Sequence, residues 1–486
     1  HQFEQVDQNL KLRYSQLNGR GISAIYGDEQ IYELAIKYHL QNPNNQPGIT
    51  QITLPPDTPY QHVNYQLLEP KPKEIYSDQD GNWIATYQLP AGQSLEVQAK
   101  LLAKVTVDQL NSNLHQPALA QHLTSQPYWP TEHSKIKELA NQQQTAQQIY
   151  QFTIDQLDYP SGELPADLER MGALAALDQP NQAICQEFTD VFITLARANQ
   201  IPARRATGYA YSENEQLRPL SLVTDVLHAW PEYYNSGNKQ WVPIDPTWGD
   251  TTQGVDYFNQ FDLNHVVFAY NGLDSELPYP AGAYKQPDKK TKDIEVKFAD
   301  EFPSTEPEFE LQLKPKKIGP LALPSFYQLR LSNLTGQAWY SNQLEFSQPV
   351  GKRTGQDKAE NGELASRGEE ASPNSPNSPN SPNSNPSLAV RLDQTQFDLL
   401  PFETKTIPVR IYNQSHWLLS QERVMVTVLA EGQALTDEFT IKTFGQVYQL
   451  GQQPTLHKPQ TLLAVGGFVV FLTLAAGSLL VLKRRR

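Results

Sequence analysis

The chain has 486 residues, a formal net charge of −14 and a pI near 5.2. This length predicts two or three domains, and the acidic balance argues against nucleic acid as a partner, since the only concentrated basic run is residues 483–486. The single cysteine, Cys185, excludes an internal disulfide. The sequence begins at His1, which we interpret as a processed or truncated start, and no signal peptide is visible.

Residues 1–115 predict a β-sandwich. Short runs of alternating apolar and polar residues are separated by turns rich in Pro, Asn and Gly. Residues 78–82, Asp-Gln-Asp-Gly-Asn, resemble a calcium loop in composition, but the bidentate Glu of an EF-hand is missing at the expected distance. A turn between two strands is the favoured interpretation of this segment.

Residues 116–290 predict a domain in which helices precede strands. Apolar residues recur at helical spacing from Ser134 to Leu157, and this pattern ends before Pro160. A second helical stripe follows Cys185, with apolar residues from Ile184 to Ala196. Asn181 is the expected N-cap, so Cys185 is expected in or just before the first helical turn, where the helix dipole favours a thiolate.

His228 and Asp245 lie on two apolar and aromatic runs that predict a β-hairpin. The connecting residues 235–238, Asn-Ser-Gly-Asn, are typical of a four-residue turn. If Tyr234 faces Lys239, then His228 lies directly opposite Asp245, close enough for the carboxylate to hold one ring nitrogen. The residues therefore predict a thiol nucleophile with a histidine base and an orienting carboxylate. A small buried hydrophobic residue is the alternative for Cys185.

Several motifs around these residues resemble the transglutaminase-like superfamily, which has a papain-like Cys-His-Asp fold. The motifs stand in the family's order between residues 134 and 270: 183–185, 197–204, 208–209, 228–230 and 241–247. The resemblance implies Cys185 as nucleophile, His228 as general base and acid, and Asp245 as the orienting carboxylate. The position of the β-sandwich before this domain resembles bacterial members of the family.

The sequence departs from the family pattern at two glycine positions. Ala183 adds a Cβ near the nucleophile, and Gln200 stands where a left-handed conformation is expected to end the helix. The backbone N–H of Cys185 is one candidate oxyanion donor, and Gln182 or Trp230 is the candidate for a second. His265 is the nearest rival base, but no hairpin places a carboxylate beside it, so we assign it a structural role.

The C-terminal half predicts further β-structure. Residues 291–350 and 387–447 have strand patterns of immunoglobulin-like type, and the sequence leaves open whether they form one domain or two. Between them, residues 351–386 are charged and then repeat Ser-Pro-Asn, which predicts a disordered linker.

Residues 461–482 form an uncharged apolar run followed by four basic residues, Lys483-Arg-Arg-Arg486. This length predicts a transmembrane helix, and the positive-inside rule places the basic tail in the cytoplasm and the bulk of the chain outside it. A buried helix of a soluble domain is the alternative. The layout also resembles the C-terminal sorting signals of bacterial surface proteins, but their Leu-Pro-x-Thr-Gly box is absent. The expected localisation is a single-pass membrane protein of the bacterial membrane-anchored type.

These observations predict a multidomain fold class: an N-terminal β-sandwich, an α+β papain-like core, a C-terminal β-sandwich-like region and a single transmembrane helix. The expected function is a cysteine acyl-transfer enzyme that acts on peptide or protein amides through a thioester, by hydrolysis more than by crosslinking. We assign no cofactor and no metal-binding residues, and the sequence leaves metal dependence open. The alternative is a catalytically silent surface binding or adhesion protein of the same fold. The sequence does not indicate the substrate or the oligomeric state.

Overall fold

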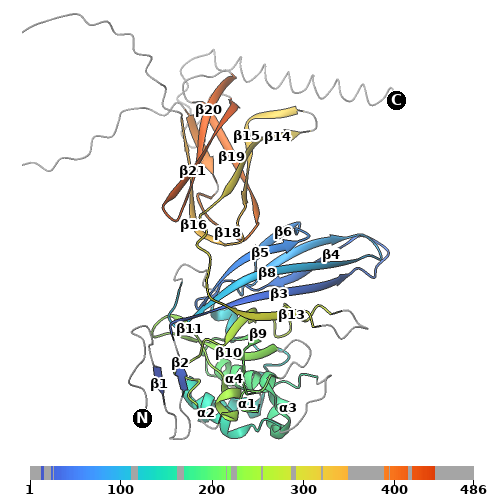
Figure 1. Cartoon of the computed structure of the whole chain (residues 1–486), viewed down its shortest axis with the longest axis vertical. Helices are drawn as coiled ribbons and strands as arrows, with labels where there is room; N and C mark the ends of the chain where they lie inside the picture. Colours follow the sequence, from blue (N-terminus) through green and yellow to red (C-terminus); the bar gives the residue numbers. More distant parts are fainter. Residues whose placement is uncertain are drawn as a thin grey trace, which may run out of the picture.

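The computed structural model describes residues 13–15, 23–25, 27–110, 119–160, 169–214, 216–220, 227–252, 255–285, 292–318, 321–348, 388–392, 394–413 and 419–443. These residues form three tiers, with a helix-containing core at one end, a β-sandwich in the middle and a second β-sandwich at the other end (Figure 1). A short pair of strands, β1 (Arg13–Ser15) and β2 (Ser23–Ile25), precedes them.

The middle tier consists of a four-stranded and a three-stranded antiparallel sheet. The first has the order β13-β3-β8-β5, with β3 (Glu29–Gln41), β5 (Gln61–Glu69), β8 (Ser94–Thr106) and β13 (Ile294–Ala299). The second has the order β4-β7-β6, with β4 (Gly48–Leu54), β6 (Glu74–Ser77) and β7 (Trp83–Leu89). Strand β13 comes from the stretch that we grouped with the C-terminal region, so this sandwich is completed by a distant segment of the chain.

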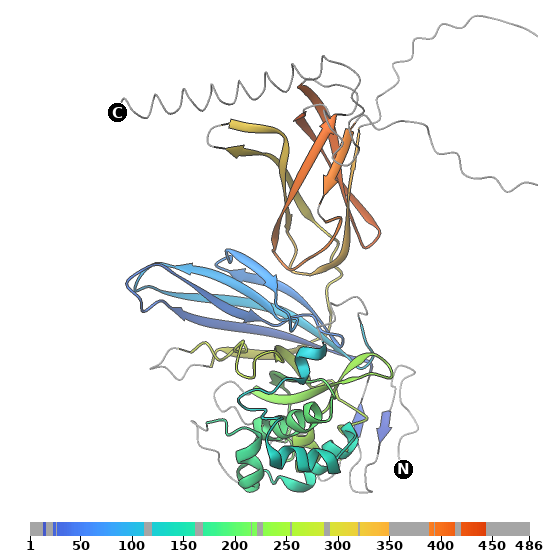
Figure 2. The same cartoon turned by 180° about the vertical axis from the view of Figure 1, so that it is seen from behind.

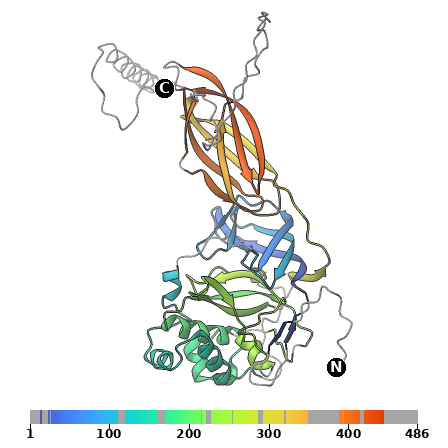
Figure 3. The same ribbon diagram turned by 90° about the vertical axis from the view of Figure 1, so that its left-hand side faces the viewer.

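In the core tier, α4 packs against an antiparallel sheet of order β11-β10-β9-β12, and the other α-helices of the described residues lie on the same side of the sheet, around α4 (Figures 2 and 3). The sheet lies between these helices and the middle sandwich. The elements of the core tier, in chain order, are η1 (Leu119–Leu123), α1 (Ser134–Gln142), α2 (Ala146–Gln156), α3 (Ala173–Asp178), η2 (Pro180–Gln182), α4 (Cys185–Ala198), β9 (Ala203–Ala210), β10 (Leu227–Asn235), β11 (Gln240–Pro243), α5 (Pro246–Thr251) and β12 (His265–Asn271).

The C-terminal tier is a single sandwich built from both stretches that flank the predicted linker. One sheet has the order β14-β15-β19-β17 and the other β18-β16-β20-β21, so strands from before and after the linker pair with each other. Their bounds are β14 (Phe309–Ile318), β15 (Leu321–Asn333), β16 (Trp339–Ser347), β17 (Leu388–Leu392), β18 (Gln396–Leu399), β19 (Thr404–Asn413), β20 (Ser420–Ala430) and β21 (Gln433–Thr443). The linker at 351–386 lies outside the described residues.

The predicted fold class and localisation need correction. The described residues are mostly β-sheet with few helices, and none of these helices has the length and apolar character needed to cross a bilayer. The segments behind the predicted transmembrane helix and cytoplasmic tail, 461–482 and 483–486, lie outside the described residues. We therefore withdraw the assignment of a single-pass membrane protein and describe the chain as multidomain and β-rich.

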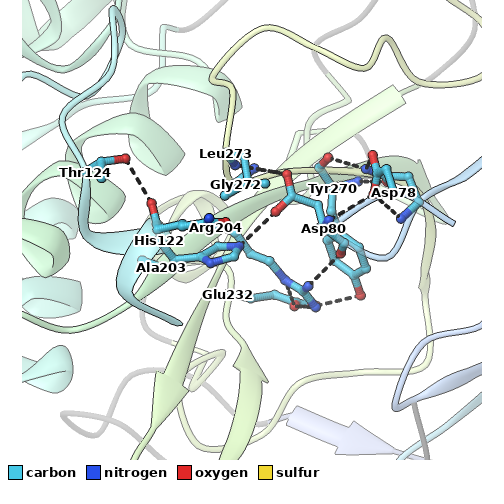
Figure 4. Close-up of polar contacts among 12 residues, drawn as sticks. Asp78, Asp80, His122, Thr124, Ala203, Arg204, Glu232, Tyr270, Gly272 and Leu273 are labelled. Carbon is cyan, nitrogen blue, oxygen red and sulfur yellow. Dashed lines mark hydrogen bonds and ion pairs between the residues drawn. The ribbon is translucent and has the colours of Figure 1, made fainter. Parts of the chain in front are cut away.

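The turn between β6 and β7 fixes the middle sandwich to the core through one buried carboxylate (Figure 4). Asp80 Oδ1 lies 2.8 Å from Nε2 of His122, and Asp80 Oδ2 accepts hydrogen bonds from the backbone N–H groups of Gly272 at 3.0 Å and Leu273 at 2.9 Å. Within the turn, Asp78 Oδ1 accepts from the backbone N–H groups of Asp80 and Asn82 at 2.9 and 2.8 Å. The predicted turn at residues 78–82 is therefore confirmed.

A buried arginine on β9 continues this anchor (Figure 4). Arg204 donates to the backbone carbonyl of Asp80 at 3.2 Å and to Glu232 Oε2 at 2.8 Å, and its guanidinium lies 3.5 Å from the centroid of the Tyr270 ring. Tyr270 donates its hydroxyl to the other oxygen of Glu232 at 3.2 Å. Because β9, β10 and β12 supply these partners, the sandwich holds the same strands that carry the candidate site.

Candidate active site

Cys185 is the first residue of α4, at the position where helical N–H groups lack intrahelical acceptors. The chain reaches it through the short helix η2 and an extended Ala183, and Ile184 is the N-cap. Glu187, in the first turn, accepts hydrogen bonds from the backbone N–H of Ile184 at 3.1 Å and of Met171 at 3.0 Å. The expected place of Cys185 is confirmed, but the expected N-cap, Asn181, lies in η2, because the Glu187 carboxylate serves the helix start instead.

Helix α4 is buried along almost its whole length, and this fixes the position of Cys185. Asp190 accepts hydrogen bonds from Trp129 Nε1 and from Arg170 Nε, both at 2.8 Å. The hydroxyl of Thr189 donates to the carbonyl oxygen of Cys185 at 2.7 Å. These contacts set the position of Cys185 relative to the neighbouring sheet.

His228 and Asp245 form a buried pair next to this helix end. His228 Nε2 lies 2.9 Å from Asp245 Oδ2, and both side chains are 0% exposed. His228 belongs to β10, and Asp245 is the N-cap of α5, where its Oδ1 accepts the N–H of Trp248 at 3.1 Å.

The predicted hairpin forms, but its register differs from the expected one by two residues. Tyr234 pairs with Trp241, where we expected Lys239, and β11 ends at Pro243, before Asp245. A shift of two residues preserves which face each side chain occupies. The carboxylate therefore still reaches His228, although from the start of α5 and not from a cross-strand position.

The charges in this pair change the pKa of both side chains, His228 and Asp245. Burial alone would lower the pKa of His228, but the charge and hydrogen bond of Asp245, and then the nearby Cys185 sulfur, raise it to about 10. Burial alone would raise the pKa of Asp245, but the charge and hydrogen bond of His228, followed by those of His265, hold it well below its usual range. At neutral pH this environment favours an imidazolium beside a carboxylate.

Aromatic rings enclose His228 on both sides. Trp248 and Trp230 stack on it with centroid separations of 5.0 and 6.1 Å and interplanar angles of 19° and 24°. Nε1 of Trp230 is buried and has no hydrogen-bond partner among the described residues. Trp230 therefore keeps a free donor beside the ring, whereas the other candidate donor, Gln182, is exposed in η2.

Gly208 allows two strands to approach closely at the level of His228. It pairs with His228 across β9 and β10, and with Val267 across β9 and β12. A Cβ added to Gly208 would lie 1.9 Å from the carbonyl oxygen of Val266. A side chain at this position would displace β12 or β9, so glycine is required by the packing of the sheet.

The two departures from the family pattern lie at the two ends of the catalytic-helix region. Ala183 is fully buried with an ordinary extended backbone, φ −73° and ψ 125°. Gln200 has φ 61°, so the predicted left-handed residue after α4 is confirmed. Only Gln200 is strained by the loss of glycine.

His265, to which we assigned a structural role from the sequence, lies beside the Asp245 carboxylate. Its Nε2 lies 3.4 Å from Asp245 Oδ2, and its Nδ1 lies 2.7 Å from Asp262 Oδ1. The spacing of Asp262 and His265 was visible, but the contact with Asp245 joins two segments that no local pattern connects.

His228, Asp245 and His265 are also residue types that bind metals, and their ligand atoms lie within 4.8 Å of one another. Both rings contact the same carboxylate oxygen, which fits hydrogen bonding and ion pairing. We therefore assign no metal to these three side chains.

Comparisons with known proteins give a family and several partial structural similarities. The model of the transglutaminase-like superfamily matches residues 133–246. No curated protein matches the chain.

Among solved structures, a candidate cysteine protease from Cytophaga hutchinsonii is 16% identical, with a TM-score of 0.35, over 56% of this chain and 86% of its own. The periplasmic domain of TgpA from Pseudomonas aeruginosa is 13% identical, with a TM-score of 0.27, over 47% and 92%. Red sea bream transglutaminase is 11% identical, with a TM-score of 0.21, over 85% and 83%.

TM-scores of this size mark partial similarity, so the assignment depends on the matched sequence alone. That match contains Cys185, His228 and Asp245, and it covers most of the core tier. The chain therefore contains a region, residues 133–246, that matches the model of the transglutaminase-like superfamily.

Proposed function

We propose that Cys185, His228 and Asp245 form the active site of a cysteine acyl-transfer enzyme that acts on peptide or protein amides. The observation that carries this proposal is the buried contact of 2.9 Å between His228 and Asp245, close to a thiol at a helix N-terminus. A thiolate is favoured there by the helix dipole and by the neighbouring imidazolium. The family assignment supports the same choice of residues.

The first half of the reaction forms a thioester. The Cys185 sulfur, after transferring its proton to His228, attacks the amide carbonyl carbon, and a tetrahedral intermediate forms. His228 then donates the proton to the amide nitrogen, the C–N bond breaks and an amine leaves. Asp245 keeps the ring oriented and its positive charge stabilised throughout.

The second half resolves the thioester. Water or an amine attacks the carbonyl carbon while His228 accepts its proton, and collapse of the intermediate breaks the C–S bond and restores the thiol and imidazole pair. Water gives hydrolysis and an amine gives a crosslink. We propose hydrolysis, because water is abundant and the residues around the site do not define an amine pocket.

Two N–H groups are proposed to stabilise the oxyanion. The first is the backbone N–H of Cys185, at the first position of α4. The second is Nε1 of Trp230, which is buried without a partner among the described residues. Donors of this kind stabilise the charge that develops on the carbonyl oxygen in the transition state.

A catalytically silent binding module is the competing function, and the complete burial of Cys185 favours it. In an enzyme, the substrate must displace part of the protein that covers Cys185 before the thiol can attack. A binding protein needs no such displacement.

An activity assay separates these functions. The purified protein is incubated with a peptide library, and new N-termini and released ammonia are measured with and without a biotinylated amine. We expect cleavage or deamidation that Cys185→Ala reduces by at least ~1,000-fold and His228→Gln strongly reduces. A matched control is His39→Gln, since His39 forms a similar pair with Asp293 at 3.2 Å on β3. Activity that survives Cys185→Ala, or no activity in any variant, contradicts the proposed enzyme.

A further inference from the structure

His265 lies between two carboxylates at the start of β12. Its Nδ1 lies 2.7 Å from Asp262 Oδ1, its Nε2 lies 3.4 Å from Asp245 Oδ2, and its side chain is 0% exposed. Carboxylates accept hydrogen bonds only, whereas a neutral imidazole has a single N–H. Each ring nitrogen of His265 therefore faces a carboxylate oxygen, which is an arrangement that N–H groups at both nitrogens would match.

Three aromatic rings complete the surroundings of His265. The ring centroids of Phe261, Trp248 and Trp230 lie 4.4, 4.6 and 4.8 Å from that of His265. Aromatic faces attract cations, and the attraction strengthens when water is excluded. The aromatic residues and the two carboxylates together form an environment suited to a positive charge.

Asp245 is held from three directions by this arrangement. His228 and His265 both contact Oδ2, at 2.9 and 3.4 Å, and the N–H of Trp248 donates to Oδ1 at 3.1 Å. A carboxylate with donors on both oxygens has little freedom to rotate. The ring of His228, in turn, can only follow the orientation of Asp245.

We propose that His265 is a positioning residue of the Cys185 site, an imidazolium that fixes Asp245 and adds a positive charge near the reactive thiolate. This inference rests on the proposed function. The order of contacts is Asp262, His265, Asp245, His228 and then Cys185. Through this sequence His265 influences the thiol without touching the substrate.

The other charged groups that face this cluster are consistent with a cation at His265. Burial alone would raise the pKa of Asp262, but the charge and hydrogen bond of His265, and then the charge of Arg218, lower it. Arg218 itself donates to the hydroxyl of Tyr257 at 2.8 Å. The centroid of the His228 ring lies 5.6 Å from that of His265. Two anions therefore flank His265, and the nearest cation on the far side of Asp245 is His228.

The test measures the rate of Cys185 alkylation by iodoacetamide between pH 4.5 and 9. Because Cys185 is the only cysteine, the label reports one site. Burial scales the rate at every pH, so the readout is the pH midpoint of the acid limb and not the absolute rate. The variants are His228→Gln, His265→Gln and Asp262→Asn, with His39→Gln as the matched control and circular dichroism as the check of folding.

We expect His265→Gln to move the acid limb to higher pH, because the thiolate loses a nearby cation. The alkylation rate on that limb, near pH 5.5, should fall by about threefold to tenfold, as expected when the thiolate loses its attraction to one partly screened positive charge. Asp262→Asn should change the profile in the same direction by a smaller factor, and His39→Gln should leave it unchanged. Loss of packing alone would change stability without moving the midpoint.

The same experiment distinguishes a failure of the His265 proposal from a failure of the proposed thiol site. If His228→Gln alters the profile but His265→Gln and Asp262→Asn coincide with the unmodified protein, His265 has no positioning role and the thiol site stands. If even His228→Gln leaves the profile unchanged, the proposed thiol site itself is wrong. Should His265→Gln not fold, Asp262→Asn decides the outcome, since it removes the carboxylate that His265 meets at Nδ1.

Discussion

The charge on His228 depends on a pair of buried groups, and the pair makes stability depend on pH. The pKa of His228 is raised to about 10, whereas an unfolded histidine titrates near ~6.5. A raised folded pKa gives a stabilisation that is fully present below the unfolded pKa and is lost as the pH rises through the folded pKa. The pKa of Asp245 is lowered, so its contribution is present above ~3.9 and is lost as the solution is acidified further.

We predict that the destabilisation caused by His228→Gln is greatest between about pH 4 and pH 6.5 and shrinks steadily from pH 6.5 towards pH 10. The measurement is urea denaturation of both proteins at several pH values, with His39→Gln as the control. A difference in unfolding free energy that does not change over this range would show that His228 carries no excess charge in the folded protein.

At the scale of single elements, the end of α4 contains a strained residue. Gln200 has φ 61°, a conformation that costs a side-chain-bearing residue ~1–2 kcal/mol relative to glycine. We predict that Gln200→Gly stabilises the protein by up to ~1 kcal/mol, less the entropy that glycine adds to the unfolded chain. Thermal denaturation of the Gln200→Gly variant and of the unmodified protein measures this difference in stability.

Gln143 provides the matched control for this prediction. It is the C-cap of α1, with φ −119°, so Gln143→Gly relieves no strain and should be neutral or destabilising. Equal effects of the two substitutions would mean that the left-handed conformation of Gln200 is not the cause.

The sequence predicted elements well where the pattern was local. The Cys185 helix, the hairpin of β10 and β11, the turn at Asp78 and the left-handed Gln200 all depend on neighbouring residues. The strand register and the contacts between segments distant in sequence could not be predicted. The hairpin register is set by the turn at residues 236–239, in which Lys239 has φ 58°, and the role of His265 depends on a contact with Asp245 from a different part of the chain.

At the scale of the whole molecule, a few buried polar contacts join the middle sandwich to the core (Figure 4). Burial alone would raise the pKa of Asp80, but the hydrogen bond of His122 and the backbone N–H of Leu273 lower it. Since β13 pairs with β3 across a wide sequence separation, the edge of the four-stranded sheet is completed by a segment that follows the core tier in the chain.

We predict that Asp80→Ala destabilises the protein by ~3–5 kcal/mol, because it leaves the His122 ring and two backbone N–H groups buried without their acceptor. Asp80→Asn keeps the shape and one acceptor, and should cost less. Denaturant unfolding followed by tryptophan fluorescence measures both variants. Equal stability of Asp80→Ala and the unmodified protein would show that the tiers are held by apolar packing alone.

The most direct measurement of the central claim is the pH dependence of Cys185 alkylation in the otherwise unmodified protein, compared with His228→Gln. If a buried imidazolium stabilises the sulfur anion, alkylation continues at pH 5–6 and His228→Gln removes this low-pH reactivity, leaving a rate that rises only towards the range of an ordinary thiol near ~8.5. Two profiles of the same shape, both rising only at alkaline pH, would contradict the claim that this site activates a nucleophile.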